Sequence, residues 1–377
     1  MSSRRKRHTG TEDLCPRRTG SEDEPCVGVV VAVRDGERYL AAALDSVLAQ
    51  HHARWHCVVV DDGSTDGTWE VAQSYRRDAR FSVVRHTGAG AAAARNRGIA
   101  ELAPGVELLA FLDGDDVWLP DALGRLVAAV RAAPSAVGAY GTAEYVDEEG
   151  TPVRPGEHPS RQRDRRRVRG LDLESVPAAE ATTGFGSLVV SGAIWPAAVV
   201  LLHRRVVEEA GGFDEDLPLH EDWDLYLRSS RAGDFVFVDE QVAWYRQHGS
   251  NITRDTARSV FFQDVVRRKT WMSEHNTPAQ RRTAARAWRA LQHRLVLASA
   301  RDTAEQARRG DGRGTAAAGK AAVLLGLQLL RRGPSEPDER LLRLSGRRPG
   351  APAVRRPREV TTSHAIPGPG PRAGRRG

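Results

Sequence analysis

Phe111-Leu112-Asp113-Gly114-Asp115-Asp116 places three carboxylates within four positions, directly after an apolar run that begins at Val106. The run 106–112 is short and lies between Pro-Gly and acidic residues, so it predicts a buried strand. Closely spaced carboxylates repel one another unless water or a cation lies among them. Such oxygen-rich clusters suit Mg²⁺ or Mn²⁺, which bind one or two carboxylates together with substrate phosphates. The alternative interpretation is a solvated acidic turn that caps a helix starting near Leu119.

Three further apolar runs precede this stretch, and each is followed by a turn and a segment with helical periodicity. The four predicted strands are 26–33, 55–60, 81–85 and 106–112. Alternating strands and helices predict an α/β fold with a mostly parallel sheet and helices on both faces. The carboxyl ends of parallel strands share one edge of the sheet, where ligands bind. Asp61-Asp62 and the 113–116 cluster are therefore expected to share a cleft, although about fifty residues separate them.

The positive charge of the chain is concentrated near its C-terminal end. The 377 residues carry a formal net charge of +7, and the segment from Arg331 onward holds twelve Arg against four acidic residues. The remaining sequence is near neutral, which argues against a nucleic-acid-binding core. The basic tail and the Arg-rich stretch 161–169 suggest the hypothesis of peripheral contact with an anionic membrane surface. A solvated loop is the alternative for 161–169.

Signals for secretion, membrane insertion or a cysteine framework are not found in the sequence. The basic N-terminus is not followed by the apolar stretch of a signal peptide, and no run of about 18 apolar residues occurs. The three cysteines, Cys15, Cys26 and Cys57, have no spacing that indicates disulfides or zinc. The prediction is a cytoplasmic protein, with a peripheral position at the inner face of the membrane as a further hypothesis. The Arg-, Ala- and Gly-rich composition points to a bacterium.

Composition divides the chain into four predicted parts. They are a disordered segment at 1–25, a folded domain at 26–255, a helical extension at 256–331 and a disordered basic tail at 332–377. The strand–helix alternation loosens near residue 140, which divides the folded domain into halves at 26–140 and 141–255.

Two charged groups elsewhere in the sequence would complete the chemistry of the acidic cluster. Arg95, in the Ala-rich helix predicted after the third strand, offers a cation for phosphate. Glu221-Asp222, at the start of a late predicted helix, offer a carboxylate that could take a proton. Each group alone also has a simpler explanation. Arg95 fits a solvated helix residue, Glu221-Asp222 fit acids that favour the positive end of a helix dipole, and Asp61–Gly67 fits an ordinary turn.

Taken in order, these motifs resemble the family-2 glycosyltransferases, which have the GT-A fold. The resemblance covers roughly 26–250. The segments that carry it are Val29–Val33 with Tyr39-Leu40, Ser46–Gln50, Val58–Thr68, Ala94–Gly98, Phe111–Pro120, Gly211–Glu215 and Glu221–Leu225. It implies a nucleotide-sugar half at 26–140 and an acceptor half at 141–255. One departure is the turn Arg34-Asp35-Gly36, where family members often carry Asn.

The resemblance also implies which residues bind a nucleotide sugar. The candidates are Val33, Asp35, Asp61, Asp62, Arg95 and Asp113. Asp61 or Asp62 would contact the base or the ribose, and Arg95 would lie near the diphosphate. Asp113 would contact the ribose or a metal-bound water. A UDP-sugar is the default donor.

The metal and the catalytic base follow from the same resemblance. Asp115 would be the ligand of Mg²⁺ or Mn²⁺ in the Asp-x-Asp motif, with Asp113 and His248 as further candidates. His248 would approach the diphosphate or the metal, and a purely structural role is the alternative. Asp222, in preference to Glu221, would be the catalytic base on the acceptor side.

The implied reaction is a single inverting displacement. Asp222 takes the proton of the acceptor hydroxyl as that oxygen attacks the anomeric carbon, and the nucleoside diphosphate leaves from the opposite face. The acceptor would be a saccharide, a lipid-linked molecule or a small molecule. Polysaccharide, envelope and secondary-metabolite glycosylation all fit.

Three other functions fit the sequence less well than this one. A nucleotidyltransferase would want a Gly-rich phosphate loop after the first strand, for which Arg34-Asp35-Gly36 is too short. A glycoside hydrolase uses paired carboxylates but needs no nucleotide site. A non-catalytic protein that binds nucleotide sugars would keep the fold, and metal-dependent consumption of a donor would exclude it.

Overall fold

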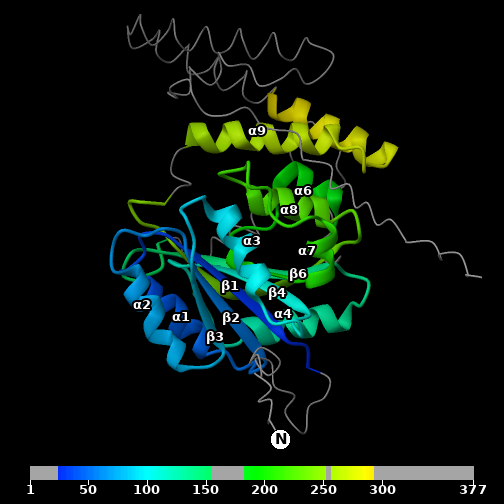
Figure 1. The fold of residues 1–377 in the computed structure, drawn as a ribbon. Coiled ribbons are helices and arrows are strands. Elements are labelled where there is room, and N and C mark those ends of the chain that lie inside the picture. The colour runs from blue at the N-terminus through cyan, green and yellow to red at the C-terminus, as the bar shows by residue number, and fades with distance from the viewer. Residues whose placement is uncertain (1–23, 154–181, 252–255, 293–377) are drawn as a thin grey trace, which may run out of the picture.

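The computed structural model describes residues 24–153, 182–251 and 256–292, drawn in colour in Figure 1. The predictions made for 1–23, for the Arg-rich stretch 161–169 and for everything after 292 lie outside the described residues. In the described ranges, no helix is both long and apolar enough to cross a membrane. The division of the folded domain near residue 140 stays a prediction.

Nine strands of the described chain form one mixed sheet. In chain order they are β1 (Val27–Val33), β2 (Trp55–Asp61), β3 (Phe81–Arg85), β4 (Leu108–Asp113), β5 (Val117–Trp118), β6 (Gly138–Val146), β7 (Thr182–Thr183), β8 (Val200–His203) and β9 (Phe235–Arg246). Their order across the sheet is β3-β2-β1-β4-β8-β6-β9-β5, and β7 pairs with β9.

The sheet is parallel in the region that the first four apolar runs build. β3, β2, β1 and β4 are parallel neighbours, and so are β6 and β9. β8 runs antiparallel to both β4 and β6, and β5 and β7 run antiparallel to β9. The predicted α/β fold of GT-A type is confirmed.

Helices and short 3₁₀ turns connect the strands. They are α1 (Leu40–Leu48), α2 (Thr68–Ser74), η1 (Tyr75–Arg77), α3 (Ala91–Glu101), α4 (Ala122–Ala132), α6 (Phe185–Ser191), η2 (Ala197–Val199), α7 (Arg204–Glu209), α8 (Glu221–Ser229) and α9 (Thr256–Met272). Helical residues continue at 278–292, so C-terminal helices are present as predicted.

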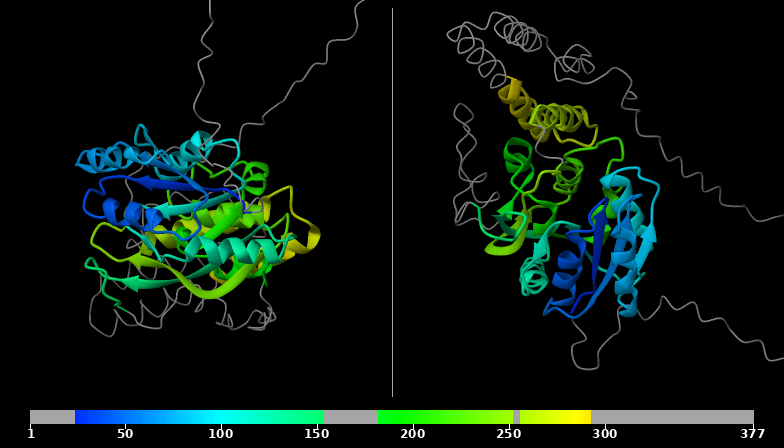
Figure 2. Two further views of the ribbon diagram at one scale, coloured as in Figure 1. Left: turned by 90° about the horizontal axis from the view of Figure 1, so that it is seen from below. Right: turned by 90° about the vertical axis from the view of Figure 1, so that its left-hand side faces the viewer.

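Helices cover both faces of β1, as predicted. A side chain at Gly98 of α3 would collide with Val30, whereas one at Gly114 would collide with Val33 beside Leu40 of α1. Because Val30 and Val33 point to opposite faces of the strand, α3 and α1 lie on opposite sides of the sheet. Figure 1 and the two further views in Figure 2 show this layering. Gly98 therefore allows α3 to approach the sheet closely.

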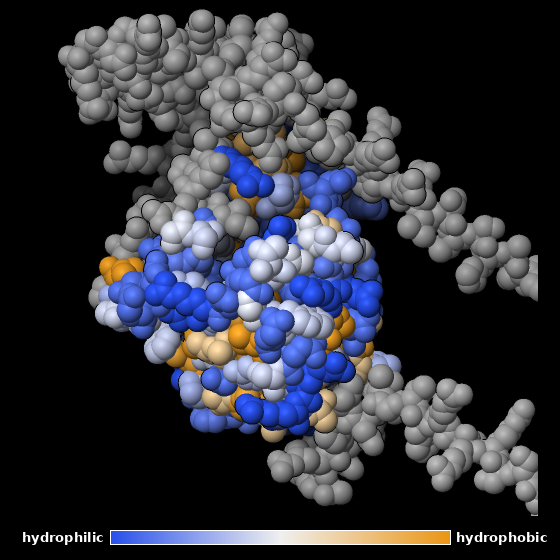
Figure 3. Space-filling model, turned by 60° about the vertical axis from the view of Figure 1, so that its left-hand side comes forward, coloured by the Kyte–Doolittle hydropathy of each residue, from blue (hydrophilic) through white to orange (hydrophobic). Residues whose placement is uncertain are grey.

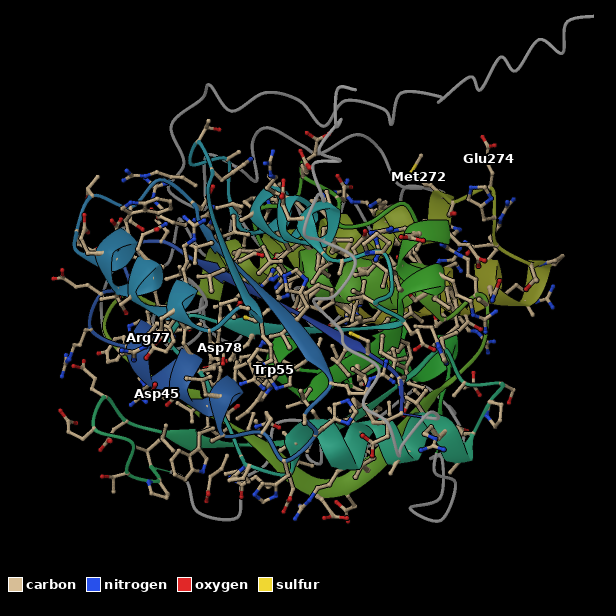
Figure 4. All side chains as sticks on the ribbon, turned by 60° about the horizontal axis from the view of Figure 1, so that its bottom comes forward. Asp45, Trp55, Arg77, Asp78, Met272 and Glu274 are labelled. Carbon is tan, nitrogen blue, oxygen red and sulfur yellow. The ribbon has the colours of Figure 1, made fainter. Side chains whose placement is uncertain are left out.

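A second helical layer lies over one side of the sheet. Helices α6 and α8 lie between the sheet and α9, which crosses the top of the molecule in Figure 1. Met272, the last residue of α9, is 64% exposed and points outward with Glu274 in Figure 4. Val153 is the other exposed large hydrophobic residue in the described ranges. Hydrophilic residues accordingly dominate the face shown in Figure 3.

Three details differ from the sequence-based expectation. Strand β4 begins two residues later than the apolar run 106–112 and includes Asp113. The sequence pattern predicts a strand only over Phe235–Val238, but β9 continues to Arg246 through a polar and exposed middle that hides the pattern. Cys57 is buried and free, but Cys26 is disulfide-bonded, which the cysteine spacing did not predict.

Candidate active site

The acidic cluster lies in a tight turn directly after β4. The backbone N–H of Asp116 donates to the carbonyl of Asp113 over 3.1 Å. Asp116 is fully buried, and its Oδ1 accepts the N–H of Arg246 over 3.0 Å. Burial, and then the charges of Asp115 and Asp113, raise the pKa of Asp116 well above its usual range. Asp116 ties the turn to β9, whereas the side chains of Asp113 and Asp115 remain 33% and 29% exposed.

Arg95 joins this turn to helix α8. Its side chain is buried, its Nη2 donates to Asp113 Oδ1 over 2.6 Å, and its Nη1 donates to Glu221 Oε1 over 2.5 Å. The guanidinium also lies over the ring of Phe213, 5.4 Å from its centroid. Burial alone would lower the pKa of Arg95, but the charges of Asp113 and Glu221 raise it. One side chain thus links two acidic motifs that are far apart in the sequence.

The two acids at the start of α8 have different surroundings. Glu221 is 8% exposed and is engaged by Arg95. Asp222 is partly exposed, and its Oδ1 accepts the N–H of Trp223 over 2.7 Å. Burial, and then the charge of Glu221, raise the pKa of Asp222 to about 7, although Arg95 opposes the shift. A carboxyl that ionises near neutral pH is suited to accept a proton from a substrate.

Tyr226 is a member of this cluster that sequence reasoning missed. It lies four residues after Asp222 on α8, so both side chains occupy the same face of the helix. Tyr226 is fully buried, and its hydroxyl has no hydrogen-bond partner among the described residues. Burial, and then the charge of Asp222, raise the pKa of this hydroxyl. The spacing from Asp222 was the available signal, but the sequence pattern instead groups Tyr226 with Trp223 and Leu227 in an apolar helical stripe.

Asp62 holds the loop that leads into α3. Its Oδ1 accepts the backbone N–H groups of Gly88 and Ala89 over 3.1 and 3.0 Å, and its Oδ2 accepts that of Gly90 over 2.8 Å. Nδ1 of His86 lies 2.8 Å from Oδ1. Because both oxygens accept hydrogen bonds within the protein, Asp62 stabilises the loop before α3.

The two carboxylate oxygens of the neighbouring Asp61 differ in their contacts. Asp61 is fully buried at the end of β2, and its Oδ1 accepts the N–H of Ser64 over 2.9 Å. Its Oδ2 lies 3.3 Å from Nε of Arg85 and makes no hydrogen bond in the described part of the chain. Of the two adjacent acids, Asp61 is the one with an oxygen that accepts no hydrogen bond from the described residues, although Arg85 forms an ion pair with it.

The turn after β1 is joined to the loop after β2. The carbonyl of Val33 accepts the N–H of Asp62 over 2.8 Å. Asp35 has a positive φ of 50°, and its Oδ1 accepts the N–H and hydroxyl of Thr65 over 2.8 and 3.1 Å. Its own N–H donates to Oγ of Ser64 over 2.9 Å. Val33 and Asp35 thus shape the rim between the two strands.

His248 lies against the acidic turn. Its Nε2 is 2.8 Å from Asp115 Oδ2, and its Nδ1 is 2.8 Å from Oγ of Ser250. The ring also packs on Tyr39, with centroids 4.9 Å apart, and Arg246 lies over the same tyrosine ring at 5.1 Å. His248 therefore contacts Asp115 of the acidic turn directly, and its approach to a metal or a diphosphate stays a prediction.

Asp115 and His248 are the donors available for a divalent ion. The described ranges contain no group of three or more His, Cys, Asp or Glu side chains that could hold a metal. Mg²⁺ and related ions often bind through one or two protein ligands and take their other ligands from substrate phosphates and water. The residues fit a site of that kind, in which one carboxylate and one imidazole are completed by a substrate. Asp113 is less suited, because one of its oxygens is bonded to Arg95.

The family comparison agrees with this geometry. A family model described as glycosyl transferase family 2 matches residues 28–184. This region belongs to glycosyl transferase family 2. The family-2 region contains the candidate nucleotide-binding acids, Arg95 and Asp115. Asp222 and His248 lie beyond the matched residues, and the structure brings both regions together through Arg95 and Asp115.

Similar proteins agree with the family-2 assignment. A glycosyltransferase of Nostoc sp. that is itself uncharacterized is 27% identical over 246 residues, which are 63% of this chain and 70% of that protein. TuaG of Bacillus subtilis, a glycosyltransferase provisionally assigned to teichuronic acid biosynthesis, is 40% identical over 104 residues, 27% of this chain and 40% of TuaG. The mannosyltransferase PcManGT from Pyrobaculum calidifontis, solved with GDP-Man and Mn²⁺, has a TM-score of 0.50 at 17% identity over 85% of this chain and 92% of that one. This last similarity supports the fold.

Proposed function

We propose that this protein is an inverting glycosyltransferase that moves a sugar from a nucleotide-diphosphate sugar, by default a UDP-sugar, to an acceptor hydroxyl. The observation that carries the proposal is the double contact of Arg95 with Asp113 and Glu221. It brings the partly exposed Asp222 to the edge of the sheet where β4 ends. In parallel sheets this edge is where ligands bind.

The donor side of the proposed site is built on the carboxyl ends of β1, β2 and β4. Asp61 would contact the base or ribose through Oδ2, which pairs with Arg85 but accepts no hydrogen bond from the described residues, and Val33 and Asp35 shape the rim beside it. Asp115 and His248 would hold Mg²⁺ or Mn²⁺. When bound, such an ion supplies positive charge that stabilises a leaving diphosphate.

Arg95 has a different role in this proposal from the one that the resemblance implied. Both of its terminal nitrogens are bonded to protein carboxylates, so its charge already has two partners. We propose that it holds Asp113 and Glu221 in place. Contact with the diphosphate stays a prediction of the sequence.

Asp222 is the proposed general base. Its carboxylate takes the proton of the acceptor hydroxyl while the acceptor oxygen forms a bond to the anomeric carbon. The bond between that carbon and the diphosphate oxygen breaks, and the electron pair leaves with the phosphate. Proton transfer to a placed carboxylate contributes about 10²–10⁴-fold to the rate.

A panel of nucleotide sugars tests the proposal. Thermal stabilisation and release of nucleoside diphosphate are measured with and without Mn²⁺, for the natural protein and for Asp115→Asn. Metal-dependent turnover of one donor that the substitution abolishes would identify the sugar. A folded protein that neither binds nor consumes any donor would exclude a glycosyltransferase and favour a protein that keeps only the fold.

The acceptor is proposed to be a saccharide or lipid-linked molecule of the bacterial envelope, with small molecules as the alternative. The provisional assignment of TuaG to teichuronic acid biosynthesis supports the first. The basic segments 161–169 and 332–377 would then keep the protein near an anionic membrane. Co-sedimentation with anionic vesicles at low salt tests this point, and no binding would end the membrane part of the proposal.

A further inference from the structure

Helix α9 contacts residues on both sides of Asp222. The contacts are Ser259 Oγ with His220 Nε2 at 3.0 Å, Arg267 over the ring of Trp223 at 4.5 Å, and Lys269 Nζ with Asp224 Oδ2 at 2.7 Å. Figure 1 shows α9 over α8 on the side away from the sheet. Helix α9 thus contacts the first turn of α8 on the side away from the sheet, and Asp222 itself remains partly exposed.

Lys269 is the branch point of these contacts. Its ammonium lies 2.7 Å from Oδ2 of Asp224 and 2.6 Å from Oδ2 of Asp214. Asp224 is 1% exposed and also accepts a hydrogen bond from Nε of Arg228 over 2.8 Å. Burial alone would raise the pKa of Asp214, but Lys269 lowers it. Lys269 and Arg228 together therefore balance the charges of the two carboxylates, and Lys269 is the cation that contacts both of them.

The second carboxylate connects Lys269 to Arg95. Asp214 follows Phe213, whose ring lies beneath the Arg95 guanidinium. The backbone of Phe213 is fixed by Asn96, which accepts its N–H over 2.8 Å and donates to its carbonyl over 2.9 Å. Lys269 consequently joins α8 to the segment that supports the Arg95–Glu221 pair.

We infer that Lys269, outside the family-2 region, is a positioning residue for the proposed base Asp222. The inference rests on the proposed function. Without the ammonium, Asp214 and Asp224 lose the cation that they share, and Arg228 alone remains to offset their repulsion. The first turn of α8 then moves away from the turn that carries Phe213. Asp222 moves with it, and a displacement of about 1 Å can cost about 10²-fold in rate.

Lys269→Met in the full-length protein removes the charge while keeping the length of the side chain. We expect kcat with the preferred donor to fall about 10- to 100-fold, while KM for the donor changes less than about threefold, because the donor side lies on other strands. Lys269→Arg restores most of the activity, since it keeps the charge. Arg268→Met is the matched control. Arg268 pairs within α9 with Asp264 at 2.6 Å, so we expect its loss to lower kcat much less than the loss of Lys269 does.

Hydrogen exchange of the backbone amides at 221–226 reports on positioning without any substrate. Lys269→Met is expected to speed exchange in this turn, and Arg268→Met is not. Unchanged exchange and kcat in Lys269→Met would overturn the inference. Equal losses of activity in both variants would also overturn it, because they would indicate general destabilisation of α9. Absent turnover in the natural protein would count against the proposed function, whereas the exchange data would still decide whether Lys269 holds α8.

Discussion

Nη1 of Arg95 lies 2.5 Å from Oε1 of Glu221, and this contact gives the two adjacent acids of α8 separate tasks. Glu221 is committed to the guanidinium. Asp222, one residue later, points to a different side of the helix and keeps a partly exposed carboxyl. Substitutions at the two positions should therefore change different properties, turnover for Asp222 and stability for Glu221.

Asp222→Asn should lose turnover without losing the fold. An amide has a similar shape but cannot accept the acceptor's proton, so we expect kcat to fall about 10²–10⁴-fold. Donor binding, measured by thermal shift, should remain. Turnover within a factor of two of the natural protein would show that another group is the base.

Glu221→Gln should instead lose stability. Breaking one contact of a buried ion pair leaves the Arg95 charge less well compensated, at a cost of about 3 kcal/mol in the free energy of unfolding. Urea denaturation measures this cost, and Arg97→Gln is the control. Arg97 and Glu101 form an exposed pair within α3, so its loss should cost less than about 1 kcal/mol.

The pH dependence of turnover should follow Asp222. Its pKa is raised to about 7, and the base works only when deprotonated, so kcat should rise with pH through about 7 and then level. Stability should change in the opposite direction. A raised pKa means that the folded state prefers the protonated carboxyl, and this contribution is lost as pH rises from about 4 to about 7. Asp222→Asn should therefore melt higher than the natural protein at pH 8, and the difference should shrink toward pH 5.

Substitutions of the two neighbouring acids at the end of β2 should also have different effects. Asp62→Ala leaves three backbone N–H groups of the loop before α3 without their acceptor, so it should destabilise the protein by about 2–3 kcal/mol. Asp61→Asn keeps the bond to Ser64 and should mainly weaken donor binding. Thermal melts with and without nucleotide distinguish the two effects. A larger loss of nucleotide binding in the Asp62 variant would reverse the assignment.

Metal dependence should require both Asp115 and His248. Mn²⁺ with a nucleoside diphosphate should raise the melting temperature of the natural protein, because the proposed site is completed by phosphate oxygens. Asp115→Asn and His248→Gln should each lose this shift while melting normally alone. A shift that survives both substitutions would place the metal elsewhere.

The strands and first helices were predictable because each carries one strong local pattern. Val27–Val33 is uniformly apolar, and so is most of Trp55–Asp61, as buried parallel strands require. Strand β9 was only partly predictable. Its middle is exposed and polar, and its pairing with β6 depends on residues about one hundred positions away.

The residues of the candidate site were predictable from the sequence, but the contacts between them were not. Motif order predicted that Asp113, Asp115 and Asp222 belong to one site. No local pattern shows that Arg95 pairs with Asp113 and Glu221, which are 18 and 126 residues away in the sequence. Likewise, nothing in Asp61-Asp62 reveals that the second acid is occupied by the loop before α3. Such assignments depend on where side chains point once the strands and helices have packed.

Among the described residues, Lys269 is the last in chain order to which we assign a role in the proposed site, so the site is completed late in synthesis. Synthesis completes the donor-side strands first and the first turn of α8 much later, and the ammonium that joins Asp214 to Asp224 arrives after both. A chain that stops before residue 269 contains Asp113, Asp115 and Asp222 but lacks that link. Under the proposed function, such a fragment would carry the donor-side residues without the contact that positions Asp222.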